Sequence, residues 1–249
     1  MIRREQEEIV ARRLDAMLGG YDANAPKRFV LYREMLEEWN SRMNLTGDTE
    51  FETVLDRHFM DSLAVLPIDG LFARDAALID VGSGAGFPGL PLAIVRPDLQ
   101  ITLLDSLAKR IGFLTAVIRE LGLEGHVQAV HARAEDAARM PSLREGFDIA
   151  VARAVAPLPV LCELLLPFVR VGGNMVCYKG PAAEEEKGAG DRASAILGGG
   201  GVELVPLALL DRPEWRHMAA IVRKQEKTPS QYPRRAGTPG RQPLGGSGA

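Results

Sequence analysis

Short apolar segments alternate with longer amphipathic ones from residue 76 onward, and this alternation limits the fold more than any other feature. Strands are predicted at 76–82, 100–105, 126–132, 147–154, 174–180, 202–209 and 217–224, and helices at 90–95, 108–121, 159–173 and 182–197. Strands separated by helices predict a mostly parallel, doubly wound α/β sheet with both faces covered. Only a short turn at 211–214 joins the last two predicted strands, so we expect them to pair antiparallel at the sheet edge.

Three amphipathic segments precede this pattern, at 5–18, from Pro26 to about residue 39, and at 52–66, and each has apolar residues at helical spacing. We therefore predict an N-terminal helical extension over residues 1–70 and an α/β domain over 71–227. Residues 228–249 are rich in proline, glycine and arginine, and we expect this tail to be disordered on its own.

Charge is distributed unevenly along the 249 residues, although the net charge is only −3. From residue 223 to the end there are six basic residues and one acid, which gives this part +5 and leaves −8 on the rest. A basic tail on an acidic body predicts a polyanionic partner that is bound locally.

The two cysteines, Cys162 and Cys177, lie in apolar segments and are predicted to be core residues in a reducing compartment. The four histidines are scattered, so the spacing predicts no metal site. No apolar run approaches the ~20 residues that a membrane span needs, and the N-terminus lacks the pattern of a signal peptide. We expect a cytoplasmic protein without a membrane partner.

A glycine-rich segment, Asp80-Val-Gly-Ser-Gly-Ala-Gly-Phe-Pro-Gly89, follows the first predicted strand and leads into a helix. Nucleoside cofactors bind at this place in doubly wound sheets. Asp80 would repel a pyrophosphate, whereas S-adenosylmethionine carries a sulfonium and an amino group that a carboxylate favours. The segment therefore predicts S-adenosylmethionine. Gly84–Gly89 also fits the dinucleotide pattern GxGxxG, so a nicotinamide cofactor and a simple strand–helix turn remain alternatives.

Other site residues are predicted from their positions at strand ends. Asp105 closes the second strand and is placed to bind both ribose hydroxyls, or to cap the next helix. Ala134 and Glu135, after the third strand, are expected beside the adenine ring or at a solvated helix start. Arg153 ends the fourth strand in the cleft, where it would bind cofactor or substrate, or pair with Asp148.

The sequence also lacks groups that some methyl transfers need. No Asn/Asp-Pro-Pro-aromatic loop follows the fourth strand, which argues against an exocyclic base amine as the acceptor. Neither cysteine is placed as an exposed nucleophile, which argues against a pyrimidine carbon. A lone pair that is already nucleophilic, such as guanine N7, needs only alignment, so no catalytic residue is predicted.

Taken together, these segments resemble the small-subunit rRNA guanine-N7 methyltransferases, also called the glucose-inhibited division protein B (RsmG, GidB) family. The resemblance runs from about Phe29 to Leu244 and rests on WNSRMNLTG, RHFMDSL, IDVGSGAGFPGLPLAI, LLDSLAKRIGFL, ARAED, ARAVAPL, YKG and QYPRRAGTPGRQPL. It implies a class I, Rossmann-like methyltransferase that modifies N7 of one guanine in the decoding-region loop of 16S rRNA. It also implies cofactor contacts at Gly82, Phe87, Ala134, Glu135 and Arg153, to which position adds Asp105.

The expected partner is 16S rRNA, alone or within the small ribosomal subunit. Arg153 and Lys179 at the rim of the cleft are candidate substrate contacts. Further candidate RNA contacts, each pair with a solvated surface as its alternative, are Lys109 with Arg110, Arg57 with His58, and Arg234 with Arg235. Two other functions remain open at this stage. One is an NAD-dependent oxidoreductase, and the other is a non-catalytic ribosome-assembly factor that binds RNA.

Overall fold

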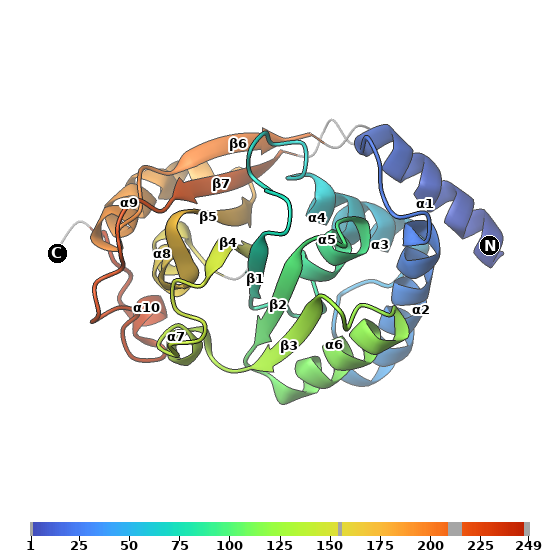
Figure 1. Ribbon diagram of the computed structural model, residues 1–249, viewed down its shortest axis with the longest axis horizontal. Helices are drawn as coiled ribbons and strands as arrows, with labels where there is room; N and C mark the ends of the chain where they lie inside the picture. Colours follow the sequence, from blue (N-terminus) through green and yellow to red (C-terminus); the bar gives the residue numbers. More distant parts are fainter. Residues whose placement is uncertain (1, 154–155, 209–215, 247–249) are drawn as a thin grey trace.

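A computed structural model of the chain describes residues 2–153, 156–208 and 216–246. Its sheet has seven strands in the order β3-β2-β1-β4-β5-β7-β6 (Figure 1). The strands are β1 (Ala77–Val81), β2 (Gln100–Asp105), β3 (Val127–His131), β4 (Phe147–Arg153), β5 (Val169–Lys179), β6 (Glu203–Leu207) and β7 (His217–Arg223). Strands β1 to β5 are parallel, and β7 is antiparallel to both of its neighbours. The predicted doubly wound, mostly parallel sheet with an antiparallel final strand is confirmed.

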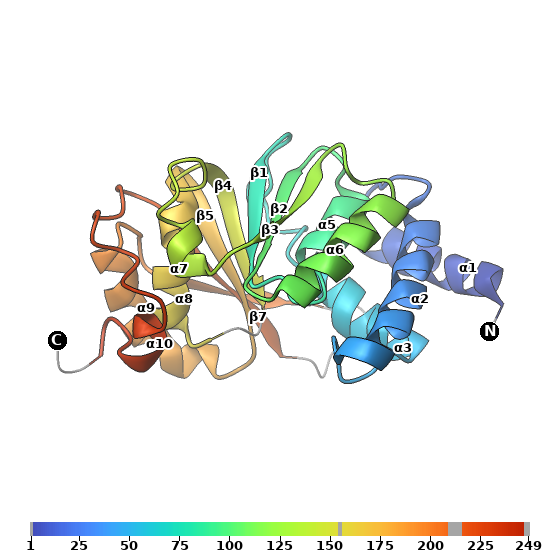
Figure 2. The same ribbon diagram turned by 90° about the horizontal axis from the view of Figure 1, so that it is seen from below.

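Helices cover both faces of this sheet. They are α1 (Arg3–Met17), α2 (Ala25–Met43), α3 (Phe51–Val54), the π-helix η1 (Leu55–Met60), α4 (Asp61–Leu63), α5 (Gly89–Val95), α6 (Ala108–Glu120), α7 (Ala134–Ala137), α8 (Leu158–Leu165), the 3₁₀ turn η2 (Leu166–Phe168), α9 (Ala183–Ile196) and α10 (Thr238–Arg241). Figure 2 shows α1 to α6 on one side of the sheet and α7 to α10 on the other.

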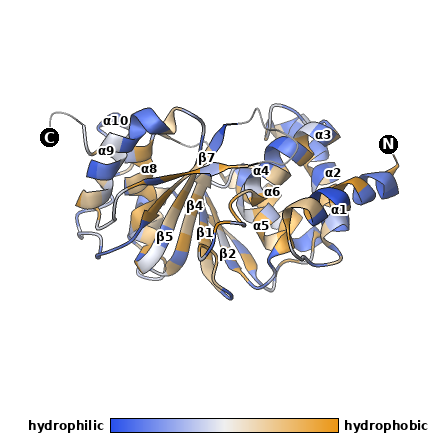
Figure 3. Ribbon diagram, turned by 90° about the horizontal axis from the view of Figure 1, so that it is seen from above, coloured by the Kyte–Doolittle hydropathy of each residue, from blue (hydrophilic) through white to orange (hydrophobic). Residues whose placement is uncertain are grey.

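Alternation along the strands produces these two layers. In β1, Leu78 packs into the core shared with α2, α5 and α6, whereas the next residue, Ile79, packs into the core shared with α8 and α9. Successive side chains of a strand point to opposite faces, so a strand buried on both faces is apolar throughout. The strands in Figure 3 are accordingly coloured largely as hydrophobic, while the helices show mixed colours.

The segment predicted as one helix over 52–66 is helical but is divided into α3, η1 and α4. A π-helix widens the turn by one residue and is found frequently at functional sites. Here it carries Arg57 and His58. Periodicity alone cannot distinguish this turn from α-helix.

The helix predicted over 159–173 is wrong in its second half. Helix α8 ends at Leu165, Pro167 lies in η2, and β5 begins at Val169. Proline cannot donate to the helical hydrogen-bond ladder. The register of β5 against β4 shifts between Phe147 and Ile149, and Gly172 lies there at a φ of +86°. Two strands, β6 and β7, pair antiparallel as expected, with β6 at the edge, while the predicted turn at 211–214 lies outside the described residues.

Residues 228–246 of the tail lie against the body and include α10, so the tail is ordered through its contacts with the body, while disorder of the tail on its own stays a prediction. Figure 1 shows α10 beside α7 and α8. Over the described ranges, no helix is long and apolar enough to cross a membrane.

Candidate functional site

A cavity of about 600 Å³ opens at the carboxyl ends of β1, β2 and β4 and the exit of β3. Ligand sites of small molecules usually have volumes of this order. All six residues predicted to bind the cofactor line it, as does Arg110. These are Gly82, Phe87, Asp105, Ala134, Glu135 and Arg153. The structure thus brings together segments that are up to 71 residues apart in the sequence.

The glycine loop forms the floor of this cavity. Gly82, Gly84 and Gly86 have φ values of +76°, +60° and +99°, which side chains rarely adopt. A Cβ on Gly86 would lie 2.3 Å from a methyl carbon of Leu90 and 2.7 Å from the Tyr32 hydroxyl. The backbone N–H groups of Gly82 and Ser83 donate to the Leu104 carbonyl, which ties the loop to β2. Glycine is therefore required both for the turn and for the close packing beneath it.

Asp105 is 3% exposed and lines the cavity at the end of β2. Its Oδ2 accepts from the Gly84 N–H at 2.9 Å, and its Oδ1 accepts from the Leu107 N–H at 2.9 Å. Arg110 Nη1 lies 3.4 Å from Oδ2. Asp105 is not the N-cap of α6, because Leu107 occupies that position. The carboxylate is instead held rigidly between the loop and α6.

Asp80 lies under the loop and is fully buried. Its Oδ2 accepts from the Gly89 N–H at 2.9 Å, while Oδ1 is the only buried side-chain N or O atom in the described ranges without a hydrogen-bond partner. Burial raises the pKa of Asp80 to about 7. A cationic ligand in the cavity would stabilise its ionised form. Asp80 and the cavity therefore fit S-adenosylmethionine, which carries positive charge and no phosphate.

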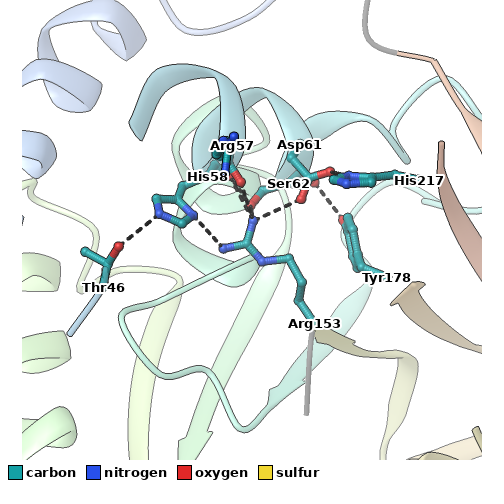
Figure 4. Close-up of polar contacts among 8 residues, drawn as sticks. All are labelled: Thr46, Arg57, His58, Asp61, Ser62, Arg153, Tyr178 and His217. Carbon is teal, nitrogen blue, oxygen red and sulfur yellow. Dashed lines mark hydrogen bonds and ion pairs between the residues drawn. The ribbon is translucent and has the colours of Figure 1, made fainter. Parts of the chain in front are cut away.

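Arg153 projects from the end of β4 into a group of polar residues from η1 and α4 (Figure 4). Its Nη1 donates to Asp61 Oδ2 at 3.1 Å, and its Nη2 lies 3.3 Å from His58 Nδ1. The guanidinium carbon is 4.8 Å from the ring centroid of Phe87. The alternative of a pair with Asp148 is not formed, because Asp148 pairs with Arg170. Arg153 joins the N-terminal helices to the glycine loop.

His58 lies between this arginine and the loop. Its ring stacks on Phe87 with centroids 4.8 Å apart and an angle of 17°, and Nε2 lies 3.1 Å from Thr46 Oγ1. Burial, followed by the charge of Arg153, lowers the pKa of His58 to about 4. The imidazole is therefore neutral at physiological pH and adds no positive charge to the cavity.

A second cavity of about 300 Å³ adjoins the first and shares Arg153 and His58 with it. Its other lining residues are Arg57, Asp61, Tyr178, Lys179, Gly180 and His217. Lys179 lies at the end of β5, where Nζ is 2.8 Å from Glu186 Oε2. Across the cavity, Asp61 Oδ1 lies 2.6 Å from His217 Nδ1, and this carboxylate raises the pKa of the imidazole. Basic groups thus line a space directly beside the larger cavity.

The sequence prediction assigned no role to Asp61, Tyr178 or His217. Asp61 lies in RHFMDSL, one of the segments that carry the resemblance, so its position could be noticed but its partner could not. Tyr178 lies in YKG, another of these segments, whereas His217 lies in a strand that looks like an ordinary core strand. Only the adjacency of β5 and β7 brings them to the same cavity.

The remaining candidate RNA contacts are placed differently. Lys109 and Arg235 are exposed, and Arg110 is half-buried at the rim of the larger cavity. Arg234 is directed inward, where Nη2 lies 2.6 Å from Oε2 of the fully buried Glu163. That each of these residues contacts RNA stays a prediction.

Comparisons with known proteins place the chain in a family. The family profile described as rRNA small subunit methyltransferase G matches residues 26–211. A Clostridium botulinum protein named ribosomal RNA small subunit methyltransferase G is 45% identical over 218 residues, which cover 88% of this chain and 90% of that protein. The protein of that name from Clostridium perfringens is 41% identical and covers 95% of this chain and 98% of its own length. The one from Alkaliphilus metalliredigens is 46% identical, with 90% and 92% covered.

Solved structures with low sequence identity share the fold. P. horikoshii TYW2, solved in complex with MeSAdo, superposes with a TM-score of 0.51 at 15% identity, covering 67% of this chain and 62% of that one. The Agrobacterium tumefaciens protein Atu636, described as a predicted O-methyltransferase, gives a TM-score of 0.53 at 16% identity, with 68% and 81% covered. At such identities the likeness shows the fold alone.

Proposed function

The chain belongs to the rRNA small subunit methyltransferase G family, and on this premise we propose that it methylates N7 of one guanine in the decoding-region loop of 16S rRNA. Its methyl donor is S-adenosylmethionine. Its partner would be 16S rRNA, alone or in the small ribosomal subunit, in the cytoplasm. The observation that carries the proposal is the adjacency of two cavities, one suited to the donor and one to an acceptor base, with Arg153 and His58 between them.

The first cavity would hold the donor through residues of three strand ends. The glycine loop would approach it closely, Asp105 would bind the ribose hydroxyls, and Ala134 with Glu135 would lie beside the adenine. When bound, S-adenosylmethionine supplies a methyl group whose bond to the sulfonium breaks as the guanine N7 lone pair forms the new N–C bond, so positive charge passes to the purine.

The chain's own residues supply alignment rather than proton transfer. N7 of guanine carries no proton, so no general base is needed, and the rate depends on holding the two reacting groups in line. Arg153 is held by Asp61 and the π-helix, so it is preorganised at the boundary of the cavities. Neutral His58 and Phe87 pack beside it and would limit the movement of its guanidinium.

Methyl transfer provides the direct test. Small subunits from cells that lack this modification would be incubated with the protein and radiolabelled S-adenosylmethionine, and the modified base would be mapped. We expect label on N7 of a single guanine, with naked 16S rRNA run in parallel to define the substrate.

Substitutions separate the two cavities in this assay. Asp105→Ala should weaken donor binding, and Arg153→Ala should lower the rate at saturating donor, since Arg153 positions the base. Arg74→Ala is the matched control, because Arg74 is exposed and lines neither cavity. RNA binding without methyl transfer to any subunit preparation would instead support a non-catalytic assembly factor and would contradict the proposal.

A further inference from the structure

The C-terminal tail, residues 228–246, is held to the body by hydrogen bonds to its backbone as well as by Tyr232 and Leu244, which pack against the core shared with α8 and α9. Arg144 Nη1 donates to the Tyr232 carbonyl at 2.9 Å, and its Nη2 donates to the Thr228 carbonyl at 2.9 Å. Arg139 Nη2 donates to the Gln231 carbonyl at 3.0 Å. Both arginines follow α7 directly in the chain, so the tail is attached to the segment that leaves the cofactor cavity.

One ion pair fixes the middle of the tail. Glu163 of α8 is 0% exposed, and its Oε1 accepts from the backbone N–H of Arg234 at 2.7 Å. The guanidinium of the same residue donates from Nε to Oε1 at 2.9 Å and from Nη2 to Oε2 at 2.6 Å. Nη2 also donates to the Gln242 carbonyl. A buried carboxylate needs such partners, so Arg234 is committed to the fold and is poorly placed to bind an RNA phosphate.

Three residues beyond Arg234, the tail reaches the cavity itself. The Gly237 N–H donates to Glu135 Oε1 at 2.8 Å, and Glu135 lines the cavity on the side expected to face the adenine. Glu135 belongs to α7, which has only four residues and cannot be rigid on its own. The tail therefore supplies a fixed donor to a side chain that would otherwise move.

We infer that the C-terminal tail is a positioning element for the cofactor, in which the Arg234–Glu163 ion pair holds Gly237 so that Gly237 fixes Glu135. This role rests on the proposed function only in taking the larger cavity as the donor site. The basic composition of the tail then serves in part to attach it to the body. Without the ion pair, Glu135 would have to be ordered when the donor binds. This ordering costs free energy, so loss of the ion pair should lower the donor affinity.

Binding of S-adenosylhomocysteine, measured by calorimetry on the full chain, tests the inference without turnover. We expect Arg234→Ala to raise the Kd about tenfold or more, the effect of losing one hydrogen bond to a charged group. Glu135→Ala should raise it by a similar factor. Glu135→Gln should bind nearly as the unaltered chain does, because the amide oxygen still accepts from Gly237.

A double substitution distinguishes an effect of the tail on Glu135 from a general destabilisation of the fold. If the tail acts through Glu135, Arg234→Ala should have little further effect on the Kd when Glu135→Ala is already present. Lys227→Ala is the matched control, since Lys227 is an exposed basic residue next to the tail, and it should leave the Kd unchanged. Melting temperatures without ligand identify any variant that fails to fold, and for such a variant Arg234→Lys, which keeps the charge, replaces alanine.

Two results would overturn the inference: an unchanged Kd in folded Arg234→Ala protein, or effects of the two substitutions that simply add. Either can occur while the unaltered chain binds the ligand and transfers methyl groups, so the proposed function would stand. Failure of the unaltered chain to bind S-adenosylhomocysteine would instead contradict the donor site itself.

Discussion

The N-terminal helices and the C-terminal tail cover opposite faces of the sheet (Figure 2), yet they are held there by different forces. The N-terminal helices dock through buried aromatic rings: the ring centroid of Tyr32 in α2 lies 5.5 Å from that of Phe87 in the glycine loop and 6.5 Å from that of Phe113 in α6. The tail docks through arginine–carbonyl hydrogen bonds and the Arg234–Glu163 pair. Apolar burial is non-directional, whereas hydrogen bonds and ion pairs require defined geometry.

Both regions end at the same cavity. The Tyr32 hydroxyl donates to the Ala85 carbonyl in the glycine loop, and His58 stacks on Phe87. From the other side, Gly237 donates to Glu135. The comparison teaches that one flank is held mainly by apolar burial and the other more by directed polar contacts, a difference that substitutions can break or sharpen.

The largest effect is expected on the apolar side. Phe29→Ala should lower the free energy of unfolding by about 4 kcal/mol, because it removes a fully buried ring and leaves a cavity. Urea denaturation followed by circular dichroism measures this. Lys27→Ala, an exposed change in the same helix, should stay within about 0.5 kcal/mol. Equal effects of the two would contradict an apolar docking of α2.

A somewhat smaller effect is expected on the polar side. Arg234→Ala should cost about 3 kcal/mol, because Glu163 is left buried without its cation. Adding Glu163→Ala should recover part of this loss, since the uncompensated charge is then gone. The corresponding apolar pair, Phe29→Ala with Phe59→Ala, should show no such recovery. Urea denaturation of the two single variants, Arg234→Ala and Phe29→Ala, and of the two double variants measures these free energies of unfolding. If stability is recovered in neither double variant, the contrast between the two flanks is contradicted.

The cavity between the two regions provides a pH test. Asp80 has a pKa of about 7, raised by burial, and a bound cation favours its carboxylate. Affinity for S-adenosylmethionine should therefore rise with pH, by about tenfold between pH 6 and pH 8. Calorimetry over this range measures the change. Arg234→Ala should shift the whole curve without altering its slope, and Asp80→Asn should flatten it. A slope that persists in Asp80→Asn would assign the titration to another group.

The smallest change in stability is expected at the exposed arginine of the tail. Arg235→Ala should alter the free energy of unfolding by less than about 0.5 kcal/mol. If Arg235 contacts a phosphate, the same change should reduce the salt dependence of 16S rRNA binding by about one counterion. Filter binding at several salt concentrations measures this. If the dependence of the 16S rRNA affinity on salt concentration is unchanged in Arg235→Ala, the phosphate contact lies elsewhere on the surface.

The same contrast explains what could be predicted from the sequence. Helix α2 was predicted because Phe29, Tyr32 and Leu36 recur at helical spacing, and the strands were predicted because buried parallel strands are apolar throughout. The tail has no apolar period, so it was expected to be disordered. Its order depends on Arg139, Arg144 and Glu163, which are distant in sequence and carry no local pattern.

The site divides in the same way. Parallel strands bring their carboxyl ends to one edge, so Gly82, Asp105 and Arg153 could be predicted to lie near one another. The partners of Arg153 could not be predicted, because Asp61 and His58 come from a helix whose π-turn directs them toward β4. The second cavity depends on β7 lying beside β5, a feature of topology rather than of local sequence.

A crystal structure with S-adenosylhomocysteine tests the central claim most directly, since that claim places the donor in the cavity between the two flanks. We predict that the ligand lies against the glycine loop, with its ribose at Asp105, its adenine beside Ala134 and Glu135, and its sulfur toward Arg153. A ligand bound elsewhere, or one that leaves Asp105 and Glu135 without contact, would contradict the account.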